Sequence, residues 1–344
     1  THLRTLVGET AFPLLRHLYV NGIRAPRTAE PGSGACNVTP TSSCGFTRTI
    51  WGSRPWGCEP RRHGDCAATP MPSWCDTQAQ VCPTSNSSGF HVHGVGASAA
   101  LAWPRNGKGV EFVFTGVAAK WAEPRCTVDH VERIAPDEAY IVMMAPCWAD
   151  WVKKCHERHL PGPLPPTGIE NVGWNQRAPT VPGSWYLDTE RSMLQYAPKR
   201  GEDPRWLSMV VPIVEQLVVV NGARGLRFRG FTFSHTTWRR PGSPEGFIEI
   251  QSGNDMQGRM TPASVSLFNS SDVSFSDCLF TRLGNAGLGV SRGSHGTTAE
   301  HCTFADISGA AYQAGCTSCL RVDKIDENNS LVNSTGRNVA VELR

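Results

Sequence analysis

Three stretches in the last third of the chain decide the fold: Gly225-LRFRGFTFSHTTW, Asp272-VSFSDCLFTRLGN and Gly296-TTAEHCTFADISG. When they are aligned, one column contains only phenylalanine: Phe233, Phe280 and Phe304. The column two places earlier contains Phe231, Cys278 and Cys302, with spacings of 47 and 24 residues. The longer spacing is close to twice the shorter one, and the Pro- and Gly-rich segment 239–263 accounts for the excess. The sequence of this region therefore repeats with a period of about 24 residues.

Repeats of this length that are built from short β runs are typical of a solenoid. Tight Gly and Asn turns between the runs favour a parallel β-helix, in which each repeat is one rung and like residues stack about 4.8 Å apart. A leucine-rich repeat would need a recurring LxxLxL, which the sequence lacks. We therefore expect an all-β chain in which the phenylalanine column stacks and Cys278 and Cys302 form a small apolar ladder.

The cysteines form a second signal, because the chain has 13 of them. Six lie in a Pro-, Gly-, Ser- and Thr-rich stretch without apolar periodicity: Cys36, Cys44, Cys58, Cys66, Cys75 and Cys82. Their gaps do not match the paired CxxC spacing of zinc sites, so we expect disulfides that close a surface flap. The pairing stays open, because six cysteines allow 15 combinations. The odd total leaves at least one thiol unpaired, or bonded outside this chain.

The cysteines and the N-glycosylation sequons together indicate where the protein is located. N-x-S/T occurs at five asparagines: Asn37, Asn86, Asn269, Asn328 and Asn333. With dense cysteines, these predict a secreted or cell-surface glycoprotein. The longest apolar run, residues 209–220, is interrupted by Glu215 and Gln216, so no membrane span is expected. The formal net charge of +3 does not call for nucleic acid. The first residues lack an apolar leader, so we expect a mature chain or a piece of a longer one.

Four regions are expected along the chain. They are a β-rich lead-in at 1–35, the cysteine-rich insertion at 36–88, a β-rich region with a hairpin at 89–204, and rungs at 205–344. Residues 185–187 and 193–196 are β-rich runs around a polar turn, which predicts the hairpin.

Several segments resemble one group of known proteins: His17-LYVNGIRAPR, Val110-EFVFTG with Trp121-AEPRCTV, Pro182-GSWYLDTERSMLQYAP, and Gly230-FTFSHTTW with the rungs after it. Their order is similar to that of secreted right-handed parallel β-helix proteins, the pectate-lyase-like superfamily, and in particular to relatives of glycoside hydrolase family 141. The resemblance covers most of residues 12–322 except the insertion. It implies a right-handed β-helix from about residue 205, preceded by an irregular β-rich region, and a lineage that acts on complex polysaccharides.

Candidate catalytic residues lie just past the phenylalanine column: His235, Arg282 and Asp306. Adjacent rungs would place a base, a fixed cation and a carboxylate in one line. A neighbouring arginine lowers the pKa of an aspartate, which suits a nucleophile or base. Trp238 and Arg239 follow closely and are expected to bind sugar. The alternative is a solvated ladder whose opposite charges pair across rungs.

A second carboxylate is available at Glu249, within a strand-like alternation. Glycoside hydrolysis uses two carboxyl groups, about 5–5.5 Å apart for retention and 6.5–9.5 Å for inversion. Glu249 and Asp306 could form such a pair, and the alternative is that Glu249 is an outward-facing strand residue. His91 and His93 share one strand face without a visible third ligand, so no metal and no cofactor are predicted.

Two functions remain open. The first is an extracellular glycoprotein of the polysaccharide-active lineage that binds or cleaves a polysaccharide or other glycan along the solenoid groove. The second is a non-catalytic building block of an extracellular matrix, cell wall or surface filament, which associates with itself or with another extracellular protein. The sequons and the odd thiol favour the second function, as do the unpaired strands at the end of any solenoid.

Overall fold

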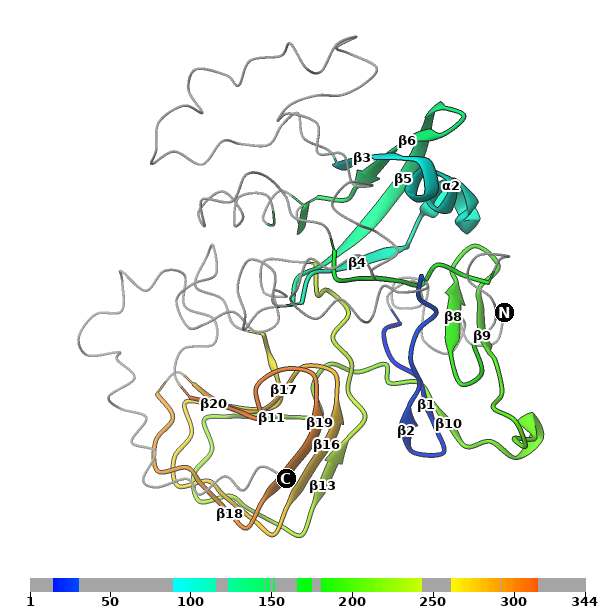
Figure 1. Cartoon of the computed structure of the whole chain (residues 1–344). Coiled ribbons are helices and arrows are strands. Elements are labelled where there is room, and N and C mark those ends of the chain that lie inside the picture. Colours follow the sequence, from blue (N-terminus) through cyan, green and yellow to red (C-terminus); the bar gives the residue numbers. More distant parts are fainter. Residues whose placement is uncertain are drawn as a thin grey trace, which may run out of the picture.

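The computed structural model of this chain describes residues 15–30, 89–115, 123–145, 147–148, 151, 166–174, 181–242, 261–291 and 293–314. These residues are mostly β-structure, with one α-helix and several parallel sheets (Figure 1). Some predicted residues lie outside the described ranges: Glu249, the sequon asparagines Asn37, Asn86, Asn328 and Asn333, and the six cysteines of the insertion. Among the described residues, no helix has the length and hydropathy needed to cross a membrane.

Three parallel sheets each take one strand from every successive repeat. The first repeat gives β11 (Val218–Asn221), β12 (Arg227–Arg229) and β13 (Thr232–Ser234). The second gives β14 (Ala263–Phe268), β15 (Ser274–Ser276) and β16 (Leu279–Leu283), and the third gives β17 (Ala286–Ser291), β18 (Thr298–Glu300) and β19 (Thr303–Ile307). The sheet orders are β11-β14-β17-β20, β12-β15-β18 and β13-β16-β19, where β20 is Tyr312–Ala314. In Figure 1 like strands lie beside one another.

The phenylalanine column is confirmed. Phe233 pairs in register with Phe280, and Phe280 pairs with Phe304. Their rings stack with centroids 4.8 and 4.6 Å apart. Cys278 and Cys302 are both free and buried, which confirms the predicted apolar ladder. Because a parallel register puts equivalent positions over one another, these columns form the core of the repeats.

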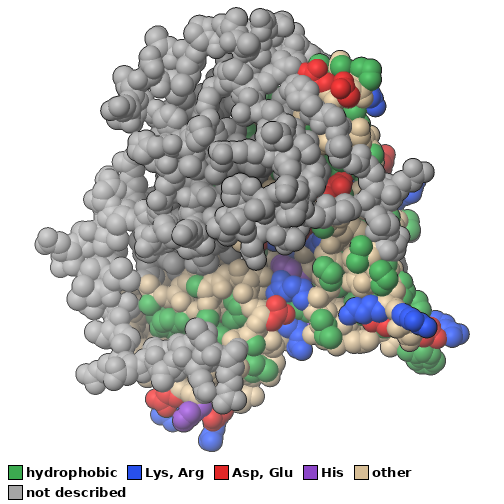
Figure 2. Space-filling model, in the orientation of Figure 1, with side chains coloured by type: hydrophobic (Ala, Val, Ile, Leu, Met, Phe, Trp, Pro, Cys, Tyr) green, Lys and Arg blue, Asp and Glu red, His purple; other side chains and the backbone are tan. Residues whose placement is uncertain are grey.

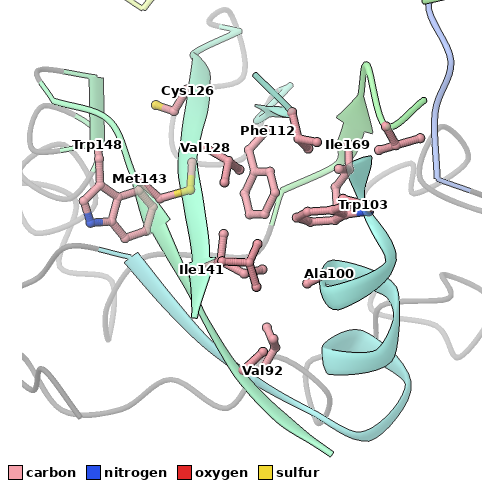
Figure 3. Close-up of a cluster of buried hydrophobic side chains, with 14 of the residues drawn as sticks. Val92, Ala100, Trp103, Phe112, Cys126, Val128, Ile141, Met143, Trp148 and Ile169 are labelled. Carbon is pink, nitrogen blue, oxygen red and sulfur yellow. The ribbon is translucent and has the colours of Figure 1, made fainter. Parts of the chain in front are cut away.

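The region before the repeats contains a five-stranded antiparallel sheet, in the order β3-β6-β5-β4-β7. Its strands are β3 (Gly89–His93), β4 (Glu111–Val113), β5 (Arg125–Ala135), β6 (Glu138–Met143) and β7 (Gly168–Glu170). Helix α2 (Gly94–Ala102) and the 3₁₀ turn η3 (Pro104–Gly107) follow β3. Figure 3 shows Ala100 and Trp103 facing Phe112, Val128 and Ile141 of the sheet. A disulfide joins Cys126 of β5 to Cys147.

The lead-in pairs with a segment far along the chain. Strands β1 (Tyr19–Val20) and β2 (Ile23–Arg24) form a hairpin, which we call the lead-in hairpin, and β1 also pairs with β10 (Met209–Val210). Its turn holds Asn21 and Gly22, both at positive φ, as a two-residue hairpin turn requires. The predicted second hairpin is confirmed as β8 (Trp185–Asp188) and β9 (Met193–Tyr196). The 3₁₀ turn η4 (Pro204–Trp206) leads from it to β10.

Candidate functional site

The predicted column of His235, Arg282 and Asp306 follows the strand register of the repeats. The backbone N–H of His235 donates to the carbonyl of Arg282, and the pairing of β16 with β19 brings Asp306 beside Arg282. All three residues have positive φ, at 64°, 55° and 55°. A left-handed residue bends a strand and redirects its side chain, so the three side chains leave the repeats at the same edge.

The lead-in hairpin lies on this column. Arg24 Nε donates to Asp306 Oδ1 at 2.9 Å, and Arg282 Nε donates to the carbonyl of Gly22 at 2.7 Å. The Tyr19 ring meets the His235 ring edge-on at 5.0 Å. Burial, together with the charge of Arg282, lowers the pKa of His235. The column therefore serves as the seat of the lead-in hairpin in this structure, and Arg282 and Asp306 each have a hairpin partner.

Beside the hairpin is a pocket of about 180 Å³ where three parts of the chain meet; we call it the junction pocket. Its charged and aromatic walls come from the lead-in, the antiparallel sheet and the repeats: Arg16, His17, Arg24, Arg27, Glu123, Arg125, Glu170 and Trp238. In Figure 2, basic, acidic and histidine side chains gather at the border between the repeats and the lead-in. The pocket is thus polar and held by elements far apart in sequence.

Arg125 holds two carboxylates at the junction pocket. Its Nη2 lies 2.6 Å from Glu123 Oε1, and its Nη1 lies 2.8 Å from Glu170 Oε2. Although burial opposes the charge, Glu170, Glu111 and Glu123 raise the pKa of Arg125 above its ordinary value. A permanently charged guanidinium therefore separates and orients the carboxylates of Glu123 and Glu170.

Behind these groups lies Glu111, with a side chain only 2% exposed. It accepts hydrogen bonds from Arg16, from Arg27 at 3.3 Å and from Arg125 at 3.0 Å. Burial opposes its ionisation, yet Arg16 and Arg27 hold the pKa of this carboxyl well below its usual range. Glu111 is therefore an anion that fixes three arginines of the pocket.

His17 adds an uncharged base. Its Nδ1 is 3.3 Å from Thr237 Oγ1. Burial, followed by the charges of Arg24, Arg16 and other arginines, lowers the pKa of His17 well below its ordinary value. A side chain at Gly284 would come within 2.6 Å of His17 Cε1, so glycine is needed for this close approach. Because its pKa is so low, the His17 imidazole is uncharged at neutral pH.

The other predicted site residues that the structure describes lie in different environments. Trp238 lines the junction pocket but is only 3% exposed, and its buried Nε1–H meets no acceptor among the residues that the structure describes. Arg239 forms an ion pair with Glu215, with Nε and Oε1 3.3 Å apart. Asp306 reaches the pocket indirectly, through Arg24. Asn269 is exposed at the end of β14, and its amide donates to Asn221 Oδ1 at 3.2 Å.

The sequence did not reveal His17, Glu123, Arg125 and Glu170, which line the junction pocket, or Glu111 behind them. The one available signal was the run Glu123-Pro-Arg125, which places opposite charges two residues apart beside a strand. Within the described ranges, no group of three or more His, Cys, Asp or Glu residues could hold a metal ion.

Comparisons with known proteins bear on the fold. No family model matches the sequence, and no curated protein matches it. A solved structure described as a glycoside hydrolase is similar, with a TM-score of 0.57 and 21% sequence identity. The match covers 89% of this chain and 49% of that chain, so the chain spans about half the length of that structure. The overall fold is therefore shared with a glycoside hydrolase.

Proposed function

We propose that this chain belongs to an extracellular glycoprotein of the polysaccharide-active β-helix lineage, and that the junction pocket binds a sugar unit of a complex polysaccharide. The observation that carries this proposal is the pocket itself, with its two carboxylates on one arginine, its neutral histidine and its indole wall. The fold shared with a glycoside hydrolase supports it. Its fixed polar and charged groups beside an indole suit a ring edged by hydroxyl groups.

The three parallel sheets support a right-handed parallel β-helix as the architecture. Each repeat supplies one strand to each sheet, and the stacked phenylalanines mark the inside of the coil. In this interpretation the rungs occupy 205–344, after a lead-in at 1–35, the stapled insertion at 36–88 and the hairpin region at 89–204. Glycosylation at Asn269 and secretion are part of the same proposal, supported by the exposure of that asparagine.

The chemistry supported best is hydrolysis of a glycosidic bond. Such hydrolysis uses one carboxyl group as acid and a second as base or nucleophile. Glu123 and Glu170 are assigned these two roles, and the uncharged His17 is assigned to hydrogen-bond a sugar hydroxyl. In this scheme His235, Arg282 and Asp306 position the lead-in hairpin and its Arg24 at the pocket, while Trp238 and Arg239 lie at its edge.

The test uses the full-length protein with a panel of neutral and acidic plant, algal and bacterial polysaccharides, scored for binding and for reducing ends released. Glu170→Gln and Glu123→Gln should abolish release and weaken binding. Glu202→Gln, at a half-buried carboxylate near β9 that lies outside the pocket, is the control and should act like the unmodified protein. Failure of every polysaccharide to bind would overturn the proposal, and binding without release would restrict it to recognition.

The structural building block remains the second candidate, because a specific feature favours it. Strands β11, β12 and β13 are all edge strands at the same end of the repeats. Apolar residues of this first repeat are exposed: Val219 by 54%, Leu226 by 39% and Phe231 by 52%. Among the described strands this edge is unpaired and could accept strands of another chain. Concentration-dependent assembly in analytical ultracentrifugation, lost in Phe231→Lys, would favour this role.

A further inference from the structure

The His17 ring has one edge on the junction pocket and the other on a buried threonine. Its Nδ1 lies 3.3 Å from Thr237 Oγ1. Thr237 is fully buried, and among the described residues that line the pocket His17 is present but Thr237 is not. The Nδ1 edge of the ring therefore faces the protein interior. Nε2 is the polar ring atom that remains for the pocket.

Backbone contacts hold this pair in place. A side chain at Gly284 would come within 2.5 Å of Thr237 Cα and 2.6 Å of His17 Cε1, so the glycine packs tightly against both residues. The N–H of Gly284 donates to Thr236 Oγ1 at 3.1 Å. The N–H of Thr237 donates to the carbonyl of Val214 at 2.9 Å. Tight packing and these hydrogen bonds therefore restrict how the imidazole and the hydroxyl face each other.

The hydroxyl of Thr237 determines which ring nitrogen of His17 is protonated. The neutral imidazole has one donor nitrogen and one acceptor nitrogen, and the hydroxyl has one hydrogen. Within the part of the chain that the structure describes, the Thr237 hydroxyl has no hydrogen-bond partner other than His17. If Nδ1–H donated to the hydroxyl, the hydroxyl hydrogen would be buried without an acceptor, which costs free energy. If the hydroxyl donates to Nδ1 instead, one bond satisfies both groups, and the hydrogen of the ring is on Nε2.

The charged groups of the pocket are consistent with a donor at Nε2. Arg24 donates to Asp306 at 2.9 Å. Arg125 donates to Glu123 at 2.6 Å and to Glu170 at 2.8 Å. These arginines therefore use carboxylates, and not the imidazole, as their acceptors. An N–H at Nε2 would give the pocket a neutral donor beside the engaged cations.

We propose that Thr237 is a positioning residue that holds His17 in the tautomer protonated at Nε2, and that this N–H donates to an oxygen of the bound sugar. The ligand part of the inference rests on the proposed saccharide function, whereas the tautomer does not. The matching group is an acceptor oxygen of the sugar: a hydroxyl, ring or carboxylate oxygen. A sugar that lacks this oxygen would bury the N–H without an acceptor, and sites built on such a hydrogen bond reject such analogues strongly.

Nitrogen NMR of the full chain, without any ligand, tests the tautomer. With isotope-labelled histidine, long-range proton–nitrogen spectra distinguish a protonated ring nitrogen from an unprotonated one. The chain has 11 histidines, so the signals of His17 are identified by their loss in His17→Gln. At neutral pH, Nε2 of His17 should be protonated and Nδ1 unprotonated. Protonation at Nδ1, or a nearly equal mixture of the two tautomers, would overturn the proposal.

Three variants show whether Thr237 is responsible for the tautomer. Thr237→Val keeps the shape of the side chain but removes the hydroxyl, so the two tautomers of His17 should become mixed. Thr237→Ser keeps a hydroxyl and should preserve the tautomer. Thr297→Val is the matched control, because it removes a buried hydroxyl that has no hydrogen-bond partner among the described residues, and it should leave the His17 signals unchanged. Thermal midpoints show that each variant is folded. An unchanged tautomer in Thr237→Val, or its loss in Thr237→Ser, would contradict the positioning role.

Binding of the polysaccharide panel to the same variants tests the ligand part. Any polysaccharide that binds the unmodified chain should bind Thr237→Val about tenfold more weakly, because the donor is no longer fixed. Thr237→Ser and Thr297→Val should stay within about twofold of the unmodified chain. Equal affinities of Thr237→Val and Thr297→Val would rule out the assigned contact with the sugar. If no polysaccharide binds while the spectra show the Nε2–H tautomer, the saccharide function fails and the role of Thr237 stands, so the two failures are distinguishable.

Discussion

At the scale of single residues, Glu111 connects three arginines of the junction. Its carboxylate is the shared partner of Arg16, Arg27 and Arg125, which come from two distant parts of the chain. The sequence offers no pattern that links these positions, because Arg16 and Glu111 are 95 residues apart and each is one of many charged residues. The network is therefore visible only once the tertiary fold has brought the segments together.

Glu111→Gln should destabilise the chain by about 3–5 kcal/mol, because it leaves buried guanidinium groups without their anion. Urea unfolding measures this loss. Asp203→Asn removes an exposed carboxylate that pairs with Arg205 and serves as the matched control, with little expected change. Equal unfolding midpoints for the two variants would contradict the assigned role of Glu111.

His17 gives the stability a dependence on pH. Its pKa in the folded chain lies well below the 6.5 of an unfolded histidine, mainly through burial. As the pH falls below about 6.5, the unfolded chain takes up a proton that the folded chain refuses, so stability decreases. Unfolding free energies measured between pH 7.5 and 5 should show this slope, and His17→Gln should flatten it. His295→Gln, at an exposed turn, should keep the slope of the unmodified protein.

At the scale of elements, the repeats show how far the sequence can predict. Identical residues at regular spacing reveal the phenylalanine column, and the strand register follows from it. Alternating runs around a polar turn also reveal the β8–β9 hairpin. Helix α2 escapes detection because its nine residues, GVGASAALA, have almost no polar face and so no helical period. The Cys126–Cys147 disulfide escapes because 13 cysteines allow many pairings.

Burial determines how much each phenylalanine of the repeats contributes to the free energy of unfolding. Phe280 lies between two stacked rings and is fully buried, so Phe280→Ala should cost about 3–5 kcal/mol. Phe231 lies in the neighbouring column of the first repeat, where half of its surface is exposed, so Phe231→Ala should cost clearly less. Denaturant unfolding of the two variants provides the comparison. A larger loss for Phe231→Ala would mean that another chain or segment covers the first repeat.

At the scale of the whole molecule, the lead-in and the repeats are fastened together. Arg24 with Asp306, Arg282 with Gly22 and His17 with Thr237 all cross between them. The spacing of His235, Arg282 and Asp306 predicts that they lie in one line, but it does not reveal that the hairpin packs on that line. The hairpin contacts are decided by long-range packing, which leaves no local pattern in the residues concerned.

These contacts should make the lead-in hairpin as protected as the repeats. In hydrogen exchange, the amides of β1 should be about as slow as those of β14. The double variant Arg24→Gln, Arg282→Gln should speed exchange in β1 by about tenfold or more, while β14 stays protected. The control is Arg224→Gln with Arg229→Gln, which breaks two highly exposed ion pairs on the repeats. Equal exchange in both double variants would show that the hairpin is held by other contacts.

The long sequence separation between Arg24 and Asp306 also imposes a delay between the synthesis of the hairpin and that of its binding partner. The two residues are 282 positions apart, and ribosomes add about 5–20 residues per second, so the hairpin precedes its seat by roughly 14 to 56 s. Until residue 210 is made, Tyr19, Val20 and the hairpin's hydrogen-bonding edge lack both β10 and the repeats, and Arg24 lacks Asp306 for the whole interval. A nascent chain in this state is open to chaperones and to wrong partners. The repeats therefore close over a hairpin that is made well before them.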